Sequence, residues 1–199
     1  MKTQIAVFVL LFFSLTPSIT NAESAKTDWF TDARFGMFIH FGLYSEPAGV
    51  WEGQTMGRNM YAEWIRMQHN WPENPGLTQD EYDTLLDRFN PVNFDADAWV
   101  NEAKNAGMKY MLITAKHHDG FALWPSEVSD YNVVDATPFG RDILGELRKA
   151  CDNHGIRLGF YYSHWQDWHH PGGVRPPWPE YSNLPLLQQP SEDEFEKYW

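Results

Sequence analysis

Two stretches of the chain show the same order of hydrophobic and polar positions. The first has apolar residues at helical spacing over 93–107, ends on a glycine, and continues into an apolar stretch over 108–114. The second repeats this order over 142–154, where a glycine again follows, and over 156–162. Glycine suits the position just past a helix end. Near-continuous apolar segments after helices are typical of buried parallel strands, so the pattern predicts βα units.

The rest of the chain adds a few further elements. The pattern predicts an earlier strand over 35–41, a helix around 61–67 and another from 79 to 89. Proline and glycine are frequent over 171–190, which indicates a long loop. Residues 191–194 read Ser-Glu-Asp-Glu, with Ser at the cap and Glu three positions later, a capping box that opens a last helix.

Two α/β architectures fit this order of elements. A doubly wound sheet would need a glycine-rich phosphate loop after its first strand, and residues 41–45 do not form one. A (β/α)8 barrel places polar residues at the carboxyl ends of successive strands, as found at His40, at 116–119 and at 161–163. A whole barrel takes about 250 residues. We therefore expect residues 23–199 to form about the first half of a TIM-like barrel, truncated in its last helix.

The first 22 residues have the pattern of a secretory signal peptide. They hold one charge, Lys2, an apolar run from Ile5 to Leu15, and a small residue, Ala22, at the expected cleavage site. The apolar run is too short to span a bilayer of about 30 Å as a helix, so no membrane anchor is expected after cleavage. The pattern predicts a secreted or periplasmic protein, or a lysosomal one in a eukaryote.

Charge and composition narrow the function classes. The 199 residues include 27 acids and 15 bases, a formal net charge of −12, and such a chain repels phosphate backbones, which argues against nucleic acid as a partner. The single cysteine, Cys151, has no partner for an intrachain disulfide and is expected to be a small buried apolar group. Aromatic residues make up 16% of the chain. Their ring faces suit either sugar rings or the protein core, and composition alone does not separate the two.

The sharpest local feature is His117-His118-Asp119, at the end of a predicted strand. Two histidines and a carboxylate could ligate zinc, although neighbouring strand residues point to opposite faces, so that both could reach one ion only if the chain bends. Neutral imidazole also donates from one nitrogen and accepts at the other, which matches vicinal sugar hydroxyls. A purely structural role is the third alternative. His40 is a candidate site residue only if a barrel places it at the same end as the histidine pair. Glu63-Trp64 fits either a sugar site or an amphipathic surface helix.

The acids near the predicted strand ends are Asp119 and Asp167. Hydrolysis of a glycosidic bond normally uses two carboxyl groups, about 5–5.5 Å apart for retention. Asp119 precedes Gly120 and could simply order a turn, and Asp167 lies beyond its strand in a tryptophan-rich loop. These residues indicate a binding half-site that lacks the reacting carboxylates.

Taken in order, the motifs of residues 27–170 resemble the α-L-fucosidases of glycoside hydrolase family 29. The matching segments are Trp29-Phe30, Ala33 to Gly42, Tyr61 to Trp64, Lys116 to Phe121, Arg141-Asp142, and Gly159 to Ser163 with Asp167-Trp168. The resemblance implies a metal-free and cofactor-free TIM-barrel enzyme that removes terminal fucose with retention, through a covalent intermediate on an aspartate, and a fucosylated glycan as its substrate.

The resemblance also implies roles for individual residues. The positions that match the family's fucose-binding residues are His40, Glu63, Trp64, His117, His118 and Tyr161. Tyr162 should then point away from the sugar and into packing. The family's nucleophile and acid/base fall beyond Trp199, so no catalytic residue is expected in this chain and the fragment is expected to be inactive. A non-catalytic fucose-binding protein derived from the enzyme, and a metallohydrolase that uses the histidine pair, are the competing hypotheses.

Overall fold

The computed structural model describes residues 21–56, 61–68, 76–174 and 190–198. The chain divides into two compact units, residues 1–34 and 35–199. The described part of the first unit is helix α1, Asn21–Ala33, followed by Arg34. Residues 1–20 lie outside the described residues, and with them nearly all of the predicted signal peptide. No helix in the described ranges is long and apolar enough to cross a membrane.

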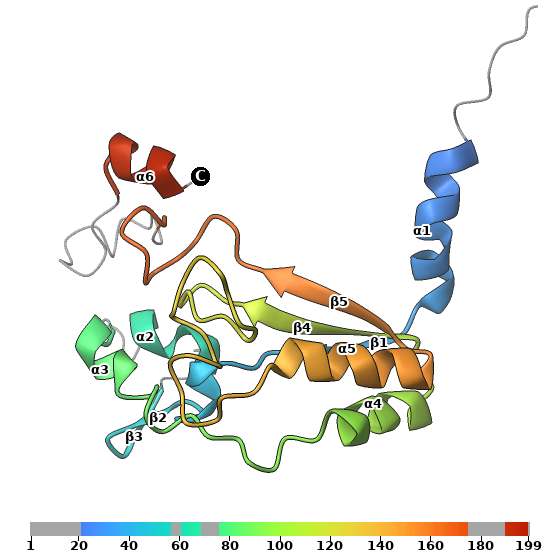
Figure 1. The fold of residues 1–199 in the computed structure, drawn as a ribbon, viewed down its shortest axis with the longest axis horizontal. Coiled ribbons are helices and arrows are strands. Elements are labelled where there is room, and N and C mark those ends of the chain that lie inside the picture. Colours follow the sequence, from blue (N-terminus) through green and yellow to red (C-terminus); the bar gives the residue numbers. More distant parts are fainter. Residues whose placement is uncertain (1–20, 57–60, 69–75, 175–189, 199) are drawn as a thin grey trace, which may run out of the picture. The chain divides into compact units, whose positions relative to one another are not determined.

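The second unit is built on a three-stranded parallel sheet. Its strands are β1, Gly36–Ile39, β4, Tyr110–Lys116, and β5, Arg157–Tyr162, and they lie side by side in the order β1-β4-β5 (Figure 1). Each pair is parallel, which confirms the predicted βα units. Parallel strands end at one edge of a sheet, so the residues that follow these three strands are brought together.

The two long helices of this unit lie within the ranges that the sequence predicts, and the first is shorter than predicted at both ends. They are α4, Ala96–Asn105, and α5, Ile143–His154. The Asp95 and Asp142 carboxylates accept hydrogen bonds from the otherwise unpaired backbone N–H groups of the first helical turn. Gly155 takes the left-handed conformation, φ 69°, that stops α5.

The two helices pack against each other and cover one face of the sheet (Figure 1). Met111 and Ile113 of β4 meet Val100 of α4 and Leu147 of α5 in the buried core. Burial of such a side chain contributes about 1.5–3 kcal/mol relative to leaving it exposed. Cys151 of α5 is buried in the same core with a free thiol, as expected.

The remaining elements are short. They are η1, Leu43–Ser45, the hairpin strands β2, Val50–Trp51, and β3, Gln54–Thr55, then η2, Ala62–Trp64, α2, Ile65–Gln68, α3, Gln79–Asp83, and α6, Glu192–Tyr198. The η2–α2 segment and α6 confirm predicted helices, and the box of Ser191 and Glu194 opens α6. Most of the predicted loop over 171–190 lies outside the described residues.

Helix α3 ends six residues before its predicted end at Phe89. The chain continues in turns closed by hydrogen bonds from Leu86 N to Asp83 O and from Arg88 N to Leu85 O. These turns still bury Leu85 and Phe89. The prediction of one continuous helix is therefore wrong beyond Asp83, because consecutive turns can bury the same apolar side chains that a helix would.

Candidate functional site

Three rings from three strand ends meet at the carboxyl edge of the sheet. His40 follows β1, His117 follows β4, and Tyr161 lies near the end of β5. The centroid of the His117 ring lies 5.7 Å from that of His40 and 5.7 Å from that of Tyr161, on which it stacks at an interplanar angle of 29°. The structure thus brings together residues that the sequence placed in separate strands.

A β-bulge at the end of β4 turns His117 toward this cluster. Thr114 pairs with Tyr161, but the next residue of β5, Tyr162, pairs with Lys116, so Ala115 is one extra residue. An inserted residue reverses the faces of the residues after it. As a result the Lys116 Nζ lies 4.9 Å from the centroid of the Tyr162 ring, and His117 shares the face of Tyr161.

Tyr162 points away from the Tyr161 face, as predicted, but it is not packed. Its side chain is half exposed and contacts the Trp124 ring at 6.1 Å. Tyr162 is the last residue of β5, and β5 lies at one edge of the described sheet.

His118 extends the ring cluster toward the η2 segment. Its ring lies 4.3 Å from that of His117 and 5.2 Å from that of Trp64, and Trp168 packs against both Trp64 and His118. Both histidines lie beyond the last residue of β4, in a turn closed by a hydrogen bond from Gly120 N to His117 O. The alternation of a strand no longer applies there, so the two rings can lie side by side.

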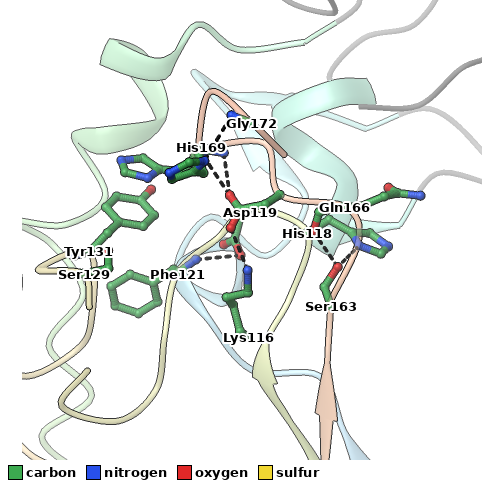
Figure 2. Close-up of polar contacts among 12 residues, drawn as sticks. Lys116, His118, Asp119, Phe121, Ser129, Tyr131, Ser163, Gln166, His169 and Gly172 are labelled. Carbon is green, nitrogen blue, oxygen red and sulfur yellow. Dashed lines mark hydrogen bonds and ion pairs between the residues drawn. The ribbon is translucent and has the colours of Figure 1, made fainter. Parts of the chain in front are cut away.

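A buried serine holds the His118 ring. The His118 Nδ1 lies 2.7 Å from the Ser163 Oγ, and that hydroxyl also lies 2.7 Å from the backbone oxygen of Gln166 (Figure 2). Ser163 itself is fixed by a hydrogen bond from its backbone N–H to Lys116 O. The imidazole therefore has a defined orientation at the edge of the cluster.

Glu63 is close enough to Tyr44 to act on it electrostatically. Burial raises the pKa of Tyr44 far above its usual value, and the negative charges of Asp119 and, more weakly, Glu63 add to the effect. The Tyr44 hydroxyl hydrogen-bonds with the Thr114 hydroxyl at 2.9 Å, and its ring lies 5.5 Å from that of His117. Glu63 is half-buried, so its carboxylate can accept hydrogen bonds at the border of the rings.

Both histidines of the pair are neutral near pH 7. Burial lowers the pKa of His117 to about 3, helped by its neighbours His118 and His40. Burial together with the positive charge of Lys116 and the proximity of His40 lowers the pKa of His118 to about 4. A neutral imidazole offers one donor and one acceptor, so the pair can bind uncharged hydroxyl groups without attracting anions.

The two nearby acids have structural partners. Asp167 pairs with the Lys116 Nζ at 2.6 Å and accepts hydrogen bonds from the backbone N–H groups of His169 and His170. Asp119 accepts hydrogen bonds from the Tyr82 hydroxyl at 2.8 Å and from the backbone N–H of Phe121. Both carboxylates are buried. They hold the loops behind the ring cluster, which agrees with the turn-ordering role considered for Asp119.

Comparison with known proteins identifies the family. A family model described as alpha-L-fucosidase matches residues 14–197. The chain belongs to the α-L-fucosidase family. It is 35% identical to the alpha-L-fucosidase of Dictyostelium discoideum over 182 residues, which cover 82% of the chain and 38% of that protein. It is 38% identical to human tissue alpha-L-fucosidase over 163 residues, 78% of the chain and 33% of the relative.

A solved structure of a fucosidase-family member agrees with this result. The unliganded alpha-L-fucosidase AlfC of Lactobacillus casei superposes with a TM-score of 0.67 at 48% identity, covering 75% of this chain and 44% of that one. A variant of AlfC was solved in complex with Fuca(1,6)GlcNAc. The chain thus spans only about a third to two-fifths of the curated relatives' length, and it is part of a glycoside hydrolase family.

Several residues around the predicted fucosidase site were not predicted as part of it. Phe38 lies between His40 and Tyr161, with ring centroids at 4.7 and 6.2 Å. The histidine pair is contacted by Trp168 and Tyr44, whose rings pack against His118 and His117. Ser163 hydrogen-bonds with His118. Phe38 could have been found from strand alternation, since it lies two residues before His40 and so on the same face. No sequence signal links Ser163 to His118, because contacts between distant segments arise only in the fold.

The structure offers no support for a metal centre. Within the part of the chain that the structure describes, no group of three or more His, Cys, Asp or Glu side chains could hold a metal ion. The carboxylate of Asp119 is directed to Tyr82 and Phe121 instead of the histidines that precede it.

Proposed function

We propose that this chain is the N-terminal part of the catalytic domain of an exo-acting, retaining α-L-fucosidase, an incomplete (β/α)8 barrel, and that terminal α-L-fucose of glycans binds at the ring cluster. The observation that carries the proposal concerns the six residues that match the family's fucose-binding positions. Five of them, all but Glu63, are joined by ring contacts at one edge of the sheet. Family membership and the fucosylated ligand of AlfC support it.

The chemistry of the cluster suits a deoxyhexose. The neutral imidazoles of His117 and His118 and the ring nitrogens of His40 bind hydroxyl groups, and the Glu63 carboxylate accepts from another. Trp64 and Phe38 supply apolar ring surface for the C–H groups and the methyl group of fucose. The arrangement binds and orients the sugar without supplying a nucleophile.

We further propose that the two reacting carboxylates belong to a part of the protein outside these 199 residues. Retention needs two carboxyl groups about 5–5.5 Å apart on either side of the scissile bond. Asp167 is neutralised by Lys116, and Asp119 is enclosed by Tyr82 and Phe121. On its own, the chain is therefore a sugar-binding half-site without hydrolytic activity. The signal-like residues 1–22 favour export of the protein to the periplasm or outside the cell.

Two measurements on the 199-residue chain test the proposal. Calorimetric titration with L-fucose should detect binding, and His117→Ala should weaken it at least about tenfold, the effect of a lost hydrogen bond to a buried site. His154→Ala is the matched control, because His154 lies at the far end of α5 and pairs with Asp97. An aryl α-L-fucoside should not be turned over.

Each result has a clear meaning. No fucose binding, or equal binding by the His117 and His154 variants, would contradict the sugar site. Turnover of the aryl fucoside by the chain alone would show that its reacting carboxylates are within these residues. Binding without turnover by the full-length protein would favour the non-catalytic fucose-binding alternative.

A further inference from the structure

The hydroxyl of Ser163 has two neighbours and a single proton. One neighbour is the backbone oxygen of Gln166, at 2.7 Å, and the other is the Nδ1 of His118, also at 2.7 Å. A carbonyl oxygen can only accept a hydrogen bond, so the serine proton points to Gln166. The Ser163 oxygen must then accept from His118, as the two dashed contacts in Figure 2 allow.

From this geometry we infer that Ser163 is a positioning residue that fixes His118 as the Nδ1–H tautomer. The His118 Nε2 then carries a lone pair and can only accept a hydrogen bond. His118 therefore selects a ligand group that donates, and in the proposed fucosidase site this group is a sugar hydroxyl. The consequence for the sugar rests on the proposed function, whereas the tautomer itself does not.

The surroundings of Ser163 favour only the Nδ1–H tautomer of His118. Ser163 is almost fully buried, so water cannot readily replace either partner. The position of Ser163 is set by the hydrogen bond from its backbone N–H to Lys116 O. The backbone N–H of Trp168 donates to the backbone oxygen of His118 at 2.7 Å. The rings of His117, Trp64 and Trp168 pack around the imidazole. The ring therefore cannot turn away without breaking several contacts.

His117 lacks an equivalent anchor. Its buried Nδ1 has no hydrogen-bond partner among the described residues, so they do not fix its tautomer. The two adjacent histidines thus differ: His118 is preset as an acceptor, and His117 is free to adapt to the ligand. This contrast provides an internal control within one molecule.

The first experiment needs no sugar. Long-range ¹H–¹⁵N correlation spectra of the chain at pH 7 distinguish protonated from unprotonated ring nitrogens. We expect His118 to show a protonated Nδ1 and an unprotonated Nε2, with at least about a tenfold excess of this tautomer. Ser163→Ala should abolish the preference while leaving the His117 signals unchanged. Ser163→Thr, which keeps a hydroxyl, should restore it. Ser129→Ala is the control, because the hydroxyl of this exposed serine accepts from Tyr131 N and not from a histidine.

A second experiment tests whether His118 selects a sugar hydroxyl that donates. Deoxyfluoro-L-fucoses, each with one hydroxyl replaced by fluorine, lose a donor at one position. In the unmodified chain one of them should bind at least about tenfold more weakly than fucose, and Ser163→Ala should remove most of that difference, since its His118 can take the Nε2–H form.

The two experiments separate the two proposals. A protonated His118 Nε2, or an imidazolium, in the unmodified chain overturns the positioning role whatever the sugar does. The expected tautomer without any fucose binding leaves the positioning role standing and contradicts the proposed function. The weakest-binding analogue could lose the same affinity relative to fucose in the unmodified chain and in Ser163→Ala. This result would show that the His118 tautomer does not determine which sugar hydroxyl donates to it.

Discussion

Asp119 should make the folded chain less stable as the pH rises, which is unusual for an aspartate. Burial raises its pKa from the ordinary 3.8 to about 6, although hydrogen bonds from the Tyr82 hydroxyl and the Phe121 N–H act in the opposite direction. Between these two pH values the folded chain keeps a proton that the unfolded chain has lost. The stabilisation is therefore complete below pH 3.8 and disappears as the pH rises through about 6.

The change in the free energy of unfolding follows from the pH range between the unfolded and folded pKa values of Asp119. Each pH unit over which only the folded chain holds the proton changes the free energy of unfolding by about 1.4 kcal/mol. From pH 3.8 to about 6 the change is about 3 kcal/mol. Asp119→Asn keeps the size of the side chain and removes the titration. The stability of this variant relative to the unmodified chain should therefore improve by about 3 kcal/mol over the whole transition, about 2 kcal/mol of it between pH 4 and pH 7.

Urea unfolding at half-unit pH steps provides the assay, and the difference between the two chains cancels the titration of all other groups. Asp167→Asn is the matched control. Burial would raise the pKa of Asp167, but the charge and hydrogen bond of Lys116 outweigh it, and the pKa is lowered overall. Its stabilisation is present above pH 3.8 and is lost as the pH falls through its folded pKa, so Asp167→Asn should be destabilising at neutral pH. A flat Asp119→Asn difference, or one with the sign of Asp167→Asn, would refute this account.

Three further predictions concern the surroundings of the site. Lys116→Met should lower the free energy of unfolding by about 3–5 kcal/mol, because the buried Asp167 carboxylate loses the positive charge that balances it, and adding Asp167→Leu should restore part of it in the same denaturation assay. Gly120→Ala should cost at least about 2 kcal/mol, since its φ is +85° and a Cβ would lie 2.5 Å from the Asp167 Oδ1; a melting temperature equal to that of the unmodified chain would contradict this. Protonation of His117 and His118 near pH 4 and below should weaken fucose binding, as calorimetry across pH would show.

The sequence predicted the parts of the fold that depend on local pattern. The apolar runs of β1, β4 and β5, and the glycine that ends α5 at Gly155, are each specified within a few residues. The β2–β3 hairpin was missed because strands of two residues are too short to show alternation.

The site was predictable only as a set of residues. Motif resemblance named His40, His117 and Tyr161, but the contacts between them depend on the pairing of three strands and on the bulge at Ala115. The pairing of Lys116 with Asp167 joins positions 51 residues apart and has no local signal. Burial, which sets the protonation of both histidines, likewise depends on the completed fold.

The extra residue in β4 has a genetic consequence. A strand alternates between its two sides, so an in-frame loss of the single codon for Ala115 would restore regular pairing with β5. Lys116 would still pair with Tyr162, and His117 would still share the face of Tyr161, because the residue lost is the one that the bulge accommodates. The core built by Met111 and Ile113, upstream of the deletion, would keep its place. Such an allele would encode a chain that retains both its hydrophobic core and the arrangement of its ring cluster.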